Sequence, residues 1–100
     1  MNSQLKRGIL SICILKEIQN EDTYGYKMLK DLEFLQLSES TLYTILKRLE
    51  ESKMLEIRLT EHEGRIRKYY HITASGLKRL IEFKEEWKEL ASVYQYVASH

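Results

Sequence analysis

The sequence has no proline, one cysteine and only four glycines among its 100 residues. Without proline or a Gly/Ser-rich tract, nothing in the chain marks a linker between domains. One cysteine cannot form an internal disulfide, and Cys13 lies in the apolar run ILSICILKEI, which favours a buried thiol in a reducing compartment. These absences predict one small folded domain, for which self-association is a natural supplement to a limited core.

Long apolar runs and an excess of one charge sign are also missing. The longest apolar stretches fall far short of the roughly 20 residues of a membrane-spanning helix, and the start, MNSQLKRG, has no signal-peptide core before its charges. We therefore expect a cytoplasmic protein with no membrane partner. Sixteen basic against 15 acidic residues leave a net charge of +1, so any affinity for nucleic acid must come from local charge placement.

Catalytic motifs are lacking too. The three histidines have no metal-ligand spacing with one another or with Cys13, and there is no Gly-rich phosphate loop or nucleophile elbow. A metal bridged by His62 and His71 across a hairpin is the one metal site left open. We expect no enzyme activity, no cofactor and no metal.

What the chain does contain is a changing hydrophobic period. It predicts a mostly buried helix over about residues 4–19, and a second helix capped by Asp22 or Thr23 that ends near Phe34. A third helix follows the N-cap Ser38. Its buried stripe has the spacing i, i+3, i+4, i+7 and consists of Leu42, Ile45, Leu46 and Leu49.

Between residues 55 and 72 the period falls to two, which predicts a β-hairpin with Gly64 near its tip. Alternation assigns Ile66, Tyr70 and Ile72 to the inward face. Lys68 falls on that same face, which is tolerable if the outer half of the hairpin projects beyond the core. We therefore expect a tip, up to Lys68, that is free for a ligand, and a base that belongs to the fold.

Thr73 is the expected cap of a long last helix. Its apolar residues keep helical spacing over more than five turns, and they include Trp87, Leu90 and Tyr94. Such a stripe is longer than one small domain can cover alone. We expect these three side chains to lie in the core or in a dimer interface.

The third helix carries hydroxyl and basic side chains opposite its buried stripe. Small hydroxyls and free backbone N–H groups near a helix N-terminus can approach phosphates or base edges. On an isolated helix, such a face is more often only a cap and a solvated edge. The order helix, helix, helix and basic hairpin nevertheless predicts a winged helix-turn-helix, in which the hairpin is the wing.

Three segments carry a family resemblance: TYGYKMLKDLE (23–33), LSESTLYTILKRLEESKML (37–55) and RKYYHIT followed by Gly76 (67–76). In this order they resemble the PadR family of bacterial transcriptional regulators, whose members show YGY in the second helix, TLYxxLxRLE in the third and RKYYxLT at the end of the wing. The resemblance extends from about residue 5 to residue 90.

The resemblance implies a mainly α fold with a small β-hairpin, a dimer joined by the last helix, and usually repression of transcription. We expect residues 1–73 to form the winged helix-turn-helix domain and residues 74–100 the dimerisation helix, with double-stranded operator DNA as partner. The candidate DNA-binding residues are Tyr24, Ser38, Ser40, Thr41, Tyr43, Thr44, Lys47, Arg48, Arg65, Arg67 and Lys68. Multidrug-responsive members of the family stack planar ligands between interface tryptophans, which implies a small aromatic effector at Trp87.

Several interpretations stay open at this stage. Gly25, between two tyrosines, would let the second helix pack closely against a neighbour. Tyr24 could pack or contact a phosphate, and Tyr26 is expected to pack at the helix start. Lys6 and Arg7 could solvate a helix end or contact DNA. The near-neutral charge also keeps a different function open, a winged helix that binds a protein partner.

Two positions depart from the family pattern. Thr44 stands where the family usually has proline, so we expect the third helix to start or bend differently and to carry an extra outward hydroxyl. Lys53 stands where the family often has glycine, so we expect a less sharp turn into the wing.

Overall fold

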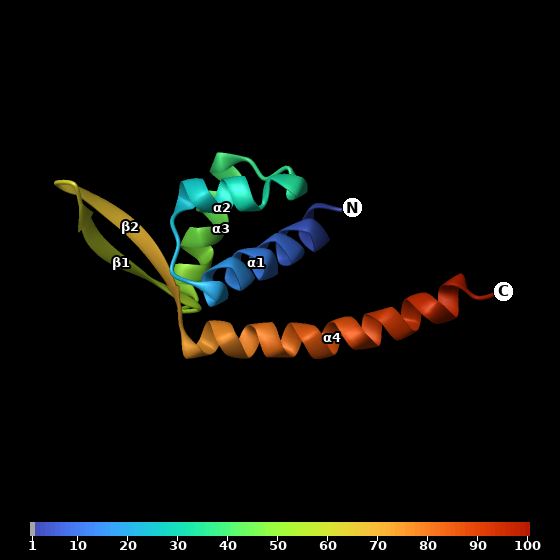
Figure 1. Ribbon diagram of the computed structural model, residues 1–100. Helices are drawn as coiled ribbons and strands as arrows, with labels where there is room; N and C mark the ends of the chain where they lie inside the picture. Colours follow the sequence, from blue (N-terminus) through green and yellow to red (C-terminus); the bar gives the residue numbers. More distant parts are fainter. Residues whose placement is uncertain (1) are drawn as a thin grey trace.

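The computed structural model describes residues 2–100 as a small helical body with a projecting hairpin (Figure 1). This arrangement confirms the predicted mainly α winged helix. The elements are α1 (Ser3–Asn20), α2 (Gly25–Asp31), the 3₁₀ turn η1 (Glu33–Leu35), α3 (Glu39–Glu51), β1 (Leu55–His62), β2 (Arg65–Ile72) and α4 (Ala74–Ala98).

The core lies where α1, α3 and the base of the hairpin meet. Fully buried leucines and isoleucines come from the middle of α1, and the predicted stripe of α3 is buried throughout. Met28 and Leu32 add the inner side of α2. The predicted stripe of α3 is therefore confirmed, because burial of one apolar face is what holds such a short helix in place.

The capping prediction for α2 was wrong. The N-cap of the helix is Tyr24, which makes no side-chain cap, so neither Asp22 nor Thr23 is at the capping position. Thr23 instead forms an isolated antiparallel bridge with Tyr70, through Thr23 N–H to Tyr70 O at 3.3 Å and Tyr70 N–H to Thr23 O at 2.8 Å. The segment between α1 and α2 thus extends the hairpin by one bridge on the β2 side.

The hairpin closes through a two-residue turn. Glu63 and Gly64 both have positive φ, 51° and 78°, which is the backbone that matches the twist of two antiparallel strands. The register pairs Leu55 with Ile72 at the base and His62 with Arg65 at the tip. A short turn with this register makes the hairpin a defined arm rather than a loose loop.

Only the base of the hairpin is buried. Ile66 lies on the face of Tyr70 and Ile72, as alternation predicts, but it is 73% exposed, and Leu59 is 64% exposed. Ile66 keeps the predicted strand face but does not reach the core, because that part of the strand extends past the helices. The expected division into a free tip up to Lys68 and a base from Tyr69 onward is confirmed.

The turn from α3 into the wing is sharp in spite of Lys53. Its amide donates to Glu50 O and the Met54 amide to Leu49 O, both at 2.9 Å, and Lys53 has a φ of 60°. This pair of bonds is the Schellman ending that glycine normally serves. The expectation of a less sharp turn was wrong, because the backbone keeps the turn and a lysine adopts the left-handed conformation.

The same junction receives the start of α4. The Thr73 hydroxyl accepts from the Gly76 amide at 3.2 Å, as the predicted cap, and donates to Lys53 O at 2.7 Å. A Cβ on Gly76 would collide with the Met54 carbonyl oxygen. The N-terminus of α4 is thus held against the end of α3 by backbone contacts.

Helix α4 runs antiparallel to α1 and then continues past the helical body (Figure 1). Its only buried residues are Gly76 and Leu80, both in its first two turns. The radius of gyration is 15.5 Å, whereas about 13 Å is typical of a compact 100-residue domain. The second half of α4 therefore projects as an arm.

An acidic cluster joins α1 to α2. Lys27 Nζ lies 2.6 Å from Asp31 and 3.8 Å from Glu21. Burial, together with the adjacent Asp31 carboxylate, raises the pKa of Glu17 in α1 above its ordinary value. Glu17 is thus a carboxylate whose ionisation the folded state opposes.

We expect Lys53→Gly to raise the free energy of unfolding by about 0.5–1 kcal/mol, because glycine removes the cost of a left-handed lysine while adding freedom to the unfolded chain. Urea titration followed by circular dichroism measures it. The matched control is Ser52→Gly, at a neighbouring residue with a φ of −82°, which should lower stability. Equal effects of the two glycines would contradict the left-handed strain.

We expect Glu17→Gln to stabilise the fold at neutral pH. Because the folded-state pKa is raised, the wild type loses stability as pH rises from about 4.5 through that pKa, and a glutamine cannot ionise. The two proteins should therefore be similar at acid pH and diverge above it in urea titrations at several pH values. Glu89→Gln, on the exposed side of α4, is the control, and parallel pH profiles for Glu17→Gln and wild type would refute the expectation.

Candidate nucleic-acid interface

A groove lies between the start of α2, the recognition-type helix α3 and the wing. It has a volume of about 560 Å³ and is lined by Tyr24, Gly25, Tyr26, Tyr43, Arg67, Lys68 and Tyr70. One wall carries the two cations of the wing, and the other carries tyrosines from α2 and α3. No carboxylate lines it, so the groove suits an anion flanked by apolar surface.

Glycine at position 25 makes this groove possible. A Cβ there would collide with the hydroxyl of Tyr43, so only glycine lets the α3 tyrosine lie against the start of α2. The sequence prediction of a close approach at Gly25 is confirmed. Burial raises the pKa of Tyr70 on the groove floor, and Tyr43 and Glu50 raise it further, so this phenol stays neutral.

The wing cation Arg67 is held beside the groove. Its guanidinium carbon lies 5.6 Å from the ring centroid of Tyr24, and that ring meets Tyr69 edge-on at 5.6 Å with an angle of 71°. Tyr24 is thus half-buried between α2 and the wing. Tyr24 lies beside Arg67, and both line the groove together with Lys68.

The start of α3 presents its hydroxyl groups outward. Ser38 caps the helix by accepting from the Thr41 amide at 3.2 Å, and its hydroxyl donates to Thr41 Oγ1 at 2.8 Å. Thr44 does not disturb the helix, because its hydroxyl donates to the Ser40 carbonyl one turn earlier at 2.8 Å. Ser38, Ser40 and Thr44 remain exposed, and Thr41 is half-buried.

A second, smaller hollow lies on the α1 side of α3. It measures about 130 Å³ and is lined by Arg7, Ser40, Thr41, Thr44, Ile45 and Arg48. Here again no carboxylate is present, and the two arginines come from different helices. The hydroxyl face of α3 therefore has cations on both sides, those of the wing and those of this hollow.

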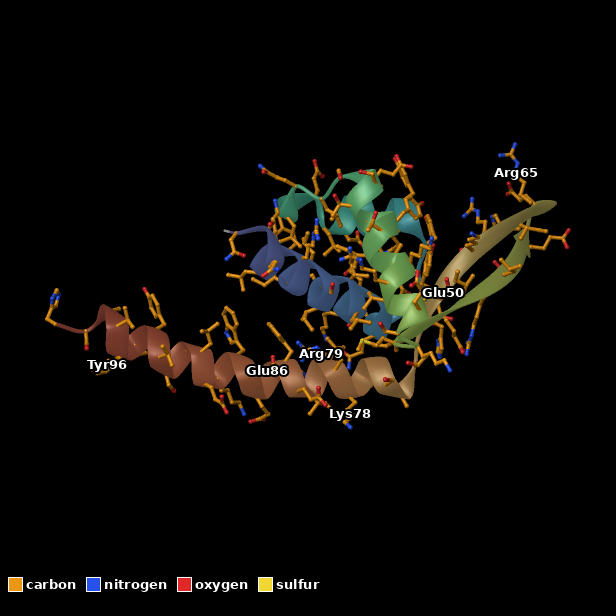
Figure 2. The ribbon with its side chains drawn as sticks, turned by 180° about the vertical axis from the view of Figure 1, so that it is seen from behind. Glu50, Arg65, Lys78, Arg79, Glu86 and Tyr96 are labelled. Carbon is orange, nitrogen blue, oxygen red and sulfur yellow. The ribbon has the colours of Figure 1, made fainter. Side chains whose placement is uncertain are left out.

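Lys47 and Lys68 meet beside the wing. Together with Tyr43 and Glu50 they line a hollow of about 260 Å³ between α3 and the hairpin. Glu50 lies toward the C-terminal end of α3, near the base of the wing (Figure 2), so its charge is kept from the leading end of the helix. Lys68, on the apolar strand face, thus lines the same hollow as Lys47 of α3.

Arg65 stands apart from this cluster. It lies at the outer end of the hairpin, next to the turn, and points away from the helices (Figure 2). Of the candidate residues, the structure therefore brings together those of α2, α3 and the inner wing, while Arg65 reaches beyond them.

Tyr26 lines the groove although it was expected to pack. It is 73% exposed, since α2 turns its other face to the core. Arg7, whose role was left open, lines the α1-side hollow together with Arg48. The signal for Tyr26 was its position two residues before Met28, which puts it about 160° around the helix from that buried residue.

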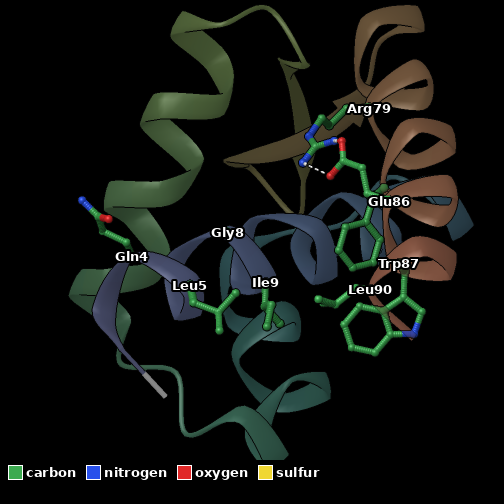
Figure 3. Close-up of a pocket in the computed structure, with 9 residues that line it drawn as sticks. Gln4, Leu5, Gly8, Ile9, Arg79, Glu86, Trp87 and Leu90 are labelled. Carbon is green, nitrogen blue, oxygen red and sulfur yellow. Dashed lines mark hydrogen bonds and ion pairs between the residues drawn. The ribbon is translucent and has the colours of Figure 1, made fainter. Parts of the chain in front are cut away.

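The other candidate site lies on α4, far from the groove. Trp87 is 52% exposed and stacks on Phe83, with centroids 5.9 Å apart. Both line a cavity of about 250 Å³ between α1 and α4, together with Leu5, Ile9 and Leu90 (Figure 3). Arg79 and Glu86 pair across its rim at 3.0 Å, and Tyr94 lies beyond it, exposed.

Within residues 2–100, no group of three or more His, Cys, Asp or Glu side chains is arranged to hold a metal ion. His71 Nδ1 lies 2.6 Å from Asp22 Oδ1, and His62 is at the far end of the hairpin. Over the same residues, no helix has the length and apolarity that a bilayer crossing requires.

Comparison with known proteins gives a consistent assignment. The family model described as the transcriptional regulator PadR-like family matches residues 14–82. A PadR-like transcriptional regulator from Bacillus cereus is 37% identical with a TM-score of 0.84, over 98% of this chain and 100% of that one. A PadR family transcriptional regulator from Eggerthella lenta is 30% identical with a TM-score of 0.83, over 97% and 88% of the two chains.

A protein of Lysinibacillus sphaericus whose function is uncharacterised is 33% identical in an alignment of 99 positions, which covers 93% of this chain and 91% of that protein. The family match covers more than half of the chain, and the relatives extend over nearly all of it. Three sequence motifs, a winged helix and these matches agree: the chain belongs to the PadR-like family of transcriptional regulators, whose members are not enzymes.

Proposed function

We propose that the protein is a homodimeric repressor that binds a pseudo-palindromic operator in the cytoplasm. The observation that supports this most is the charge pattern of one surface: exposed hydroxyls of α3 lie between two sets of cations, with no carboxylate lining the groove or the α1-side hollow. Hydroxyls read base edges at short range, and flanking cations bind the phosphates on both sides of a groove.

In this proposal α3 enters a major groove. Ser40, Tyr43, Thr44 and Lys47 face the bases, while Ser38 and Thr41 hold the start of the helix near a phosphate. Arg48 and Arg7 bind the backbone on the α1 side. Arg67 and Lys68 bind it on the wing side, where Tyr24 lies beside Arg67, and Arg65 at the tip reaches the backbone or the minor groove farther along.

The near-neutral net charge is compatible with this function. Polyanion binding depends on where the charges lie, and neither the groove nor the α1-side hollow is lined by a carboxylate. A dimer would present two such basic surfaces together. Two-fold symmetry would place the half-sites about one helical turn, or a multiple of it, apart.

The exposed apolar surface of α4 suggests separate regions of the chain for DNA binding and for dimerisation. We assign residues 1–73 to DNA reading and residues 74–100 to dimerisation. Trp87, Leu90 and Tyr94 form an exposed apolar stripe on an arm that leaves the helical body, which a second copy would bury (Figure 1). Leu77, Ile81 and Val97 extend the same kind of surface along the helix.

The cavity beside Trp87 is where we place a small aromatic effector. Its walls are apolar, and a stacked pair of aromatic rings lines one side (Figure 3). Planar ligands bind by stacking on such rings. Because the cavity adjoins the proposed dimer surface, occupancy would alter how the two copies, and hence the two α3 helices, are spaced.

We expect Lys68→Ala to weaken binding to operator and to random duplex alike. It should lower the slope of log Kd against log salt by about one unit per protomer, because one phosphate contact is lost. Fluorescence anisotropy of labelled duplex over a salt series measures both quantities. Lys78→Ala is the matched control, since Lys78 lies on α4 away from the wing (Figure 2).

An unchanged salt slope for Lys68→Ala would remove that residue from the phosphate contacts. Absence of any salt-sensitive DNA binding by the wild type would favour the other function, a winged helix that binds a protein partner.

We expect the double variant Leu90→Glu and Tyr94→Glu to sediment as a monomer at concentrations where wild type is a dimer. Burying two unpaired carboxylates costs several kcal/mol, enough to weaken association at least about 100-fold. Sedimentation velocity measures it. Glu89→Lys changes a charge on the opposite side of α4 and should remain dimeric; a dimeric double variant would place the interface elsewhere.

A further inference from the structure

The stack of Arg67 on Tyr24 has a structural cause in the bridge between Thr23 and Tyr70. In an antiparallel pair, residues on either side of a bridge also face each other. Tyr24 therefore lies beside Tyr69, and Asp22 beside His71, on the wing face that looks away from the core. Both contacts are present, the rings at 5.6 Å and Asp22 Oδ1 to His71 Nδ1 at 2.6 Å.

Arg67 shares this face because it is two residues from Tyr69 on the same strand. Arg58, opposite Tyr69 on β1, also contacts Asp22, at 3.6 Å. The ring of Tyr24 is thus fixed by backbone bonds on one side and by Tyr69 on another. It meets Arg67 as a rigid surface rather than as a mobile side chain.

The outer wing has little other support. Residues 58–68 are all exposed, and Arg67 has no hydrogen bond or ion pair to a carboxylate in the described chain. A long side chain without such a contact samples many rotamers and loses that freedom when it binds a phosphate. A cation over an aromatic face has part of that freedom removed beforehand.

We infer that Tyr24 is a positioning residue: the face of its ring holds the Arg67 guanidinium at the mouth of the groove, ready for a phosphodiester group. The ring carries this role, and the hydroxyl is dispensable. The inference rests on the proposed DNA-binding function and assigns Tyr24 a different role from a direct phosphate contact. It also links the wing to α3, since Gly25, the next residue, contacts Tyr43.

The test compares wild type with four variants, and measures DNA affinity over a salt series by fluorescence anisotropy of labelled duplex. The variants are Tyr24→Phe, Tyr24→Leu, Arg67→Ala and the double variant Tyr24→Leu with Arg67→Ala. Tyr24→Phe should bind as wild type, and Tyr24→Leu should bind about three- to fivefold more weakly per protomer. In the Arg67→Ala background, Tyr24→Leu should add nothing. With Lys68→Ala, which lies on the other strand face, the effect of Tyr24→Leu should persist in full.

Equal losses for Tyr24→Phe and Tyr24→Leu would overturn the inference in favour of a hydroxyl contact to phosphate. Additive losses for Tyr24→Leu and Arg67→Ala would overturn it as well. If Arg67→Ala leaves DNA binding unchanged, the proposed phosphate contact of Arg67 is wrong, and so is the positioning role of Tyr24. If Arg67→Ala weakens binding and Tyr24→Leu does not, only the positioning role fails.

A measurement on the free protein covers the case in which Tyr24→Leu does not fold. Ring currents should move the Arg67 side-chain protons upfield in the NMR spectrum of wild type and of Tyr24→Phe alike, since both keep the aromatic face. Random-coil shifts for Arg67 in both folded proteins would contradict the stack.

Discussion

The bridge between Thr23 and Tyr70 is the interaction on which the proposed binding surface depends. Two backbone hydrogen bonds join the segment after α1 to the base of the wing, and both residues are buried. The bridge places Tyr24 against the wing and starts α2 so that Gly25 meets Tyr43. The Thr23 hydroxyl itself finds no hydrogen-bond partner among the described residues, which indicates that the position serves the backbone rather than the side chain.

A second constraint is the small size of the core that a 100-residue chain can form. The chain buries its apolar residues around α1, α3 and the wing base, and it leaves most of α4 and the outer wing in solvent. Both exposed parts are regular secondary structure, a helix and a paired hairpin, so each offers an ordered surface to a binding partner. In the proposed dimer, the arm would complete its burial against a second copy, while the wing would complete its contacts against DNA.

The chain carries similar numbers of basic and acidic residues, 16 and 15, rather than an excess of one sign. Acids and bases nearly balance over the whole chain, at a net charge of +1. Glu17, Glu21 and Asp31 gather near Lys27, whereas the charged residues that line the groove and the α1-side hollow are all cations. A protein of this kind would depend on short-range complementarity more than on a long-range field, because opposite charges elsewhere on the surface cancel at distance.

The sequence by itself determined the elements and their order, because the 3.6-residue and two-residue periods, the caps at Ser38 and Thr73 and the glycine turn are local properties of the chain. It also indicated Gly25 as a point of close approach. Only the tertiary structure decided that Thr23 bridges Tyr70, that Tyr26 faces outward, that Ile66 leaves the core and that Lys53 accepts a left-handed turn. These outcomes depend on which distant segments meet, and on how far each strand or helix extends past the core, and neither is encoded in the pattern of a single segment.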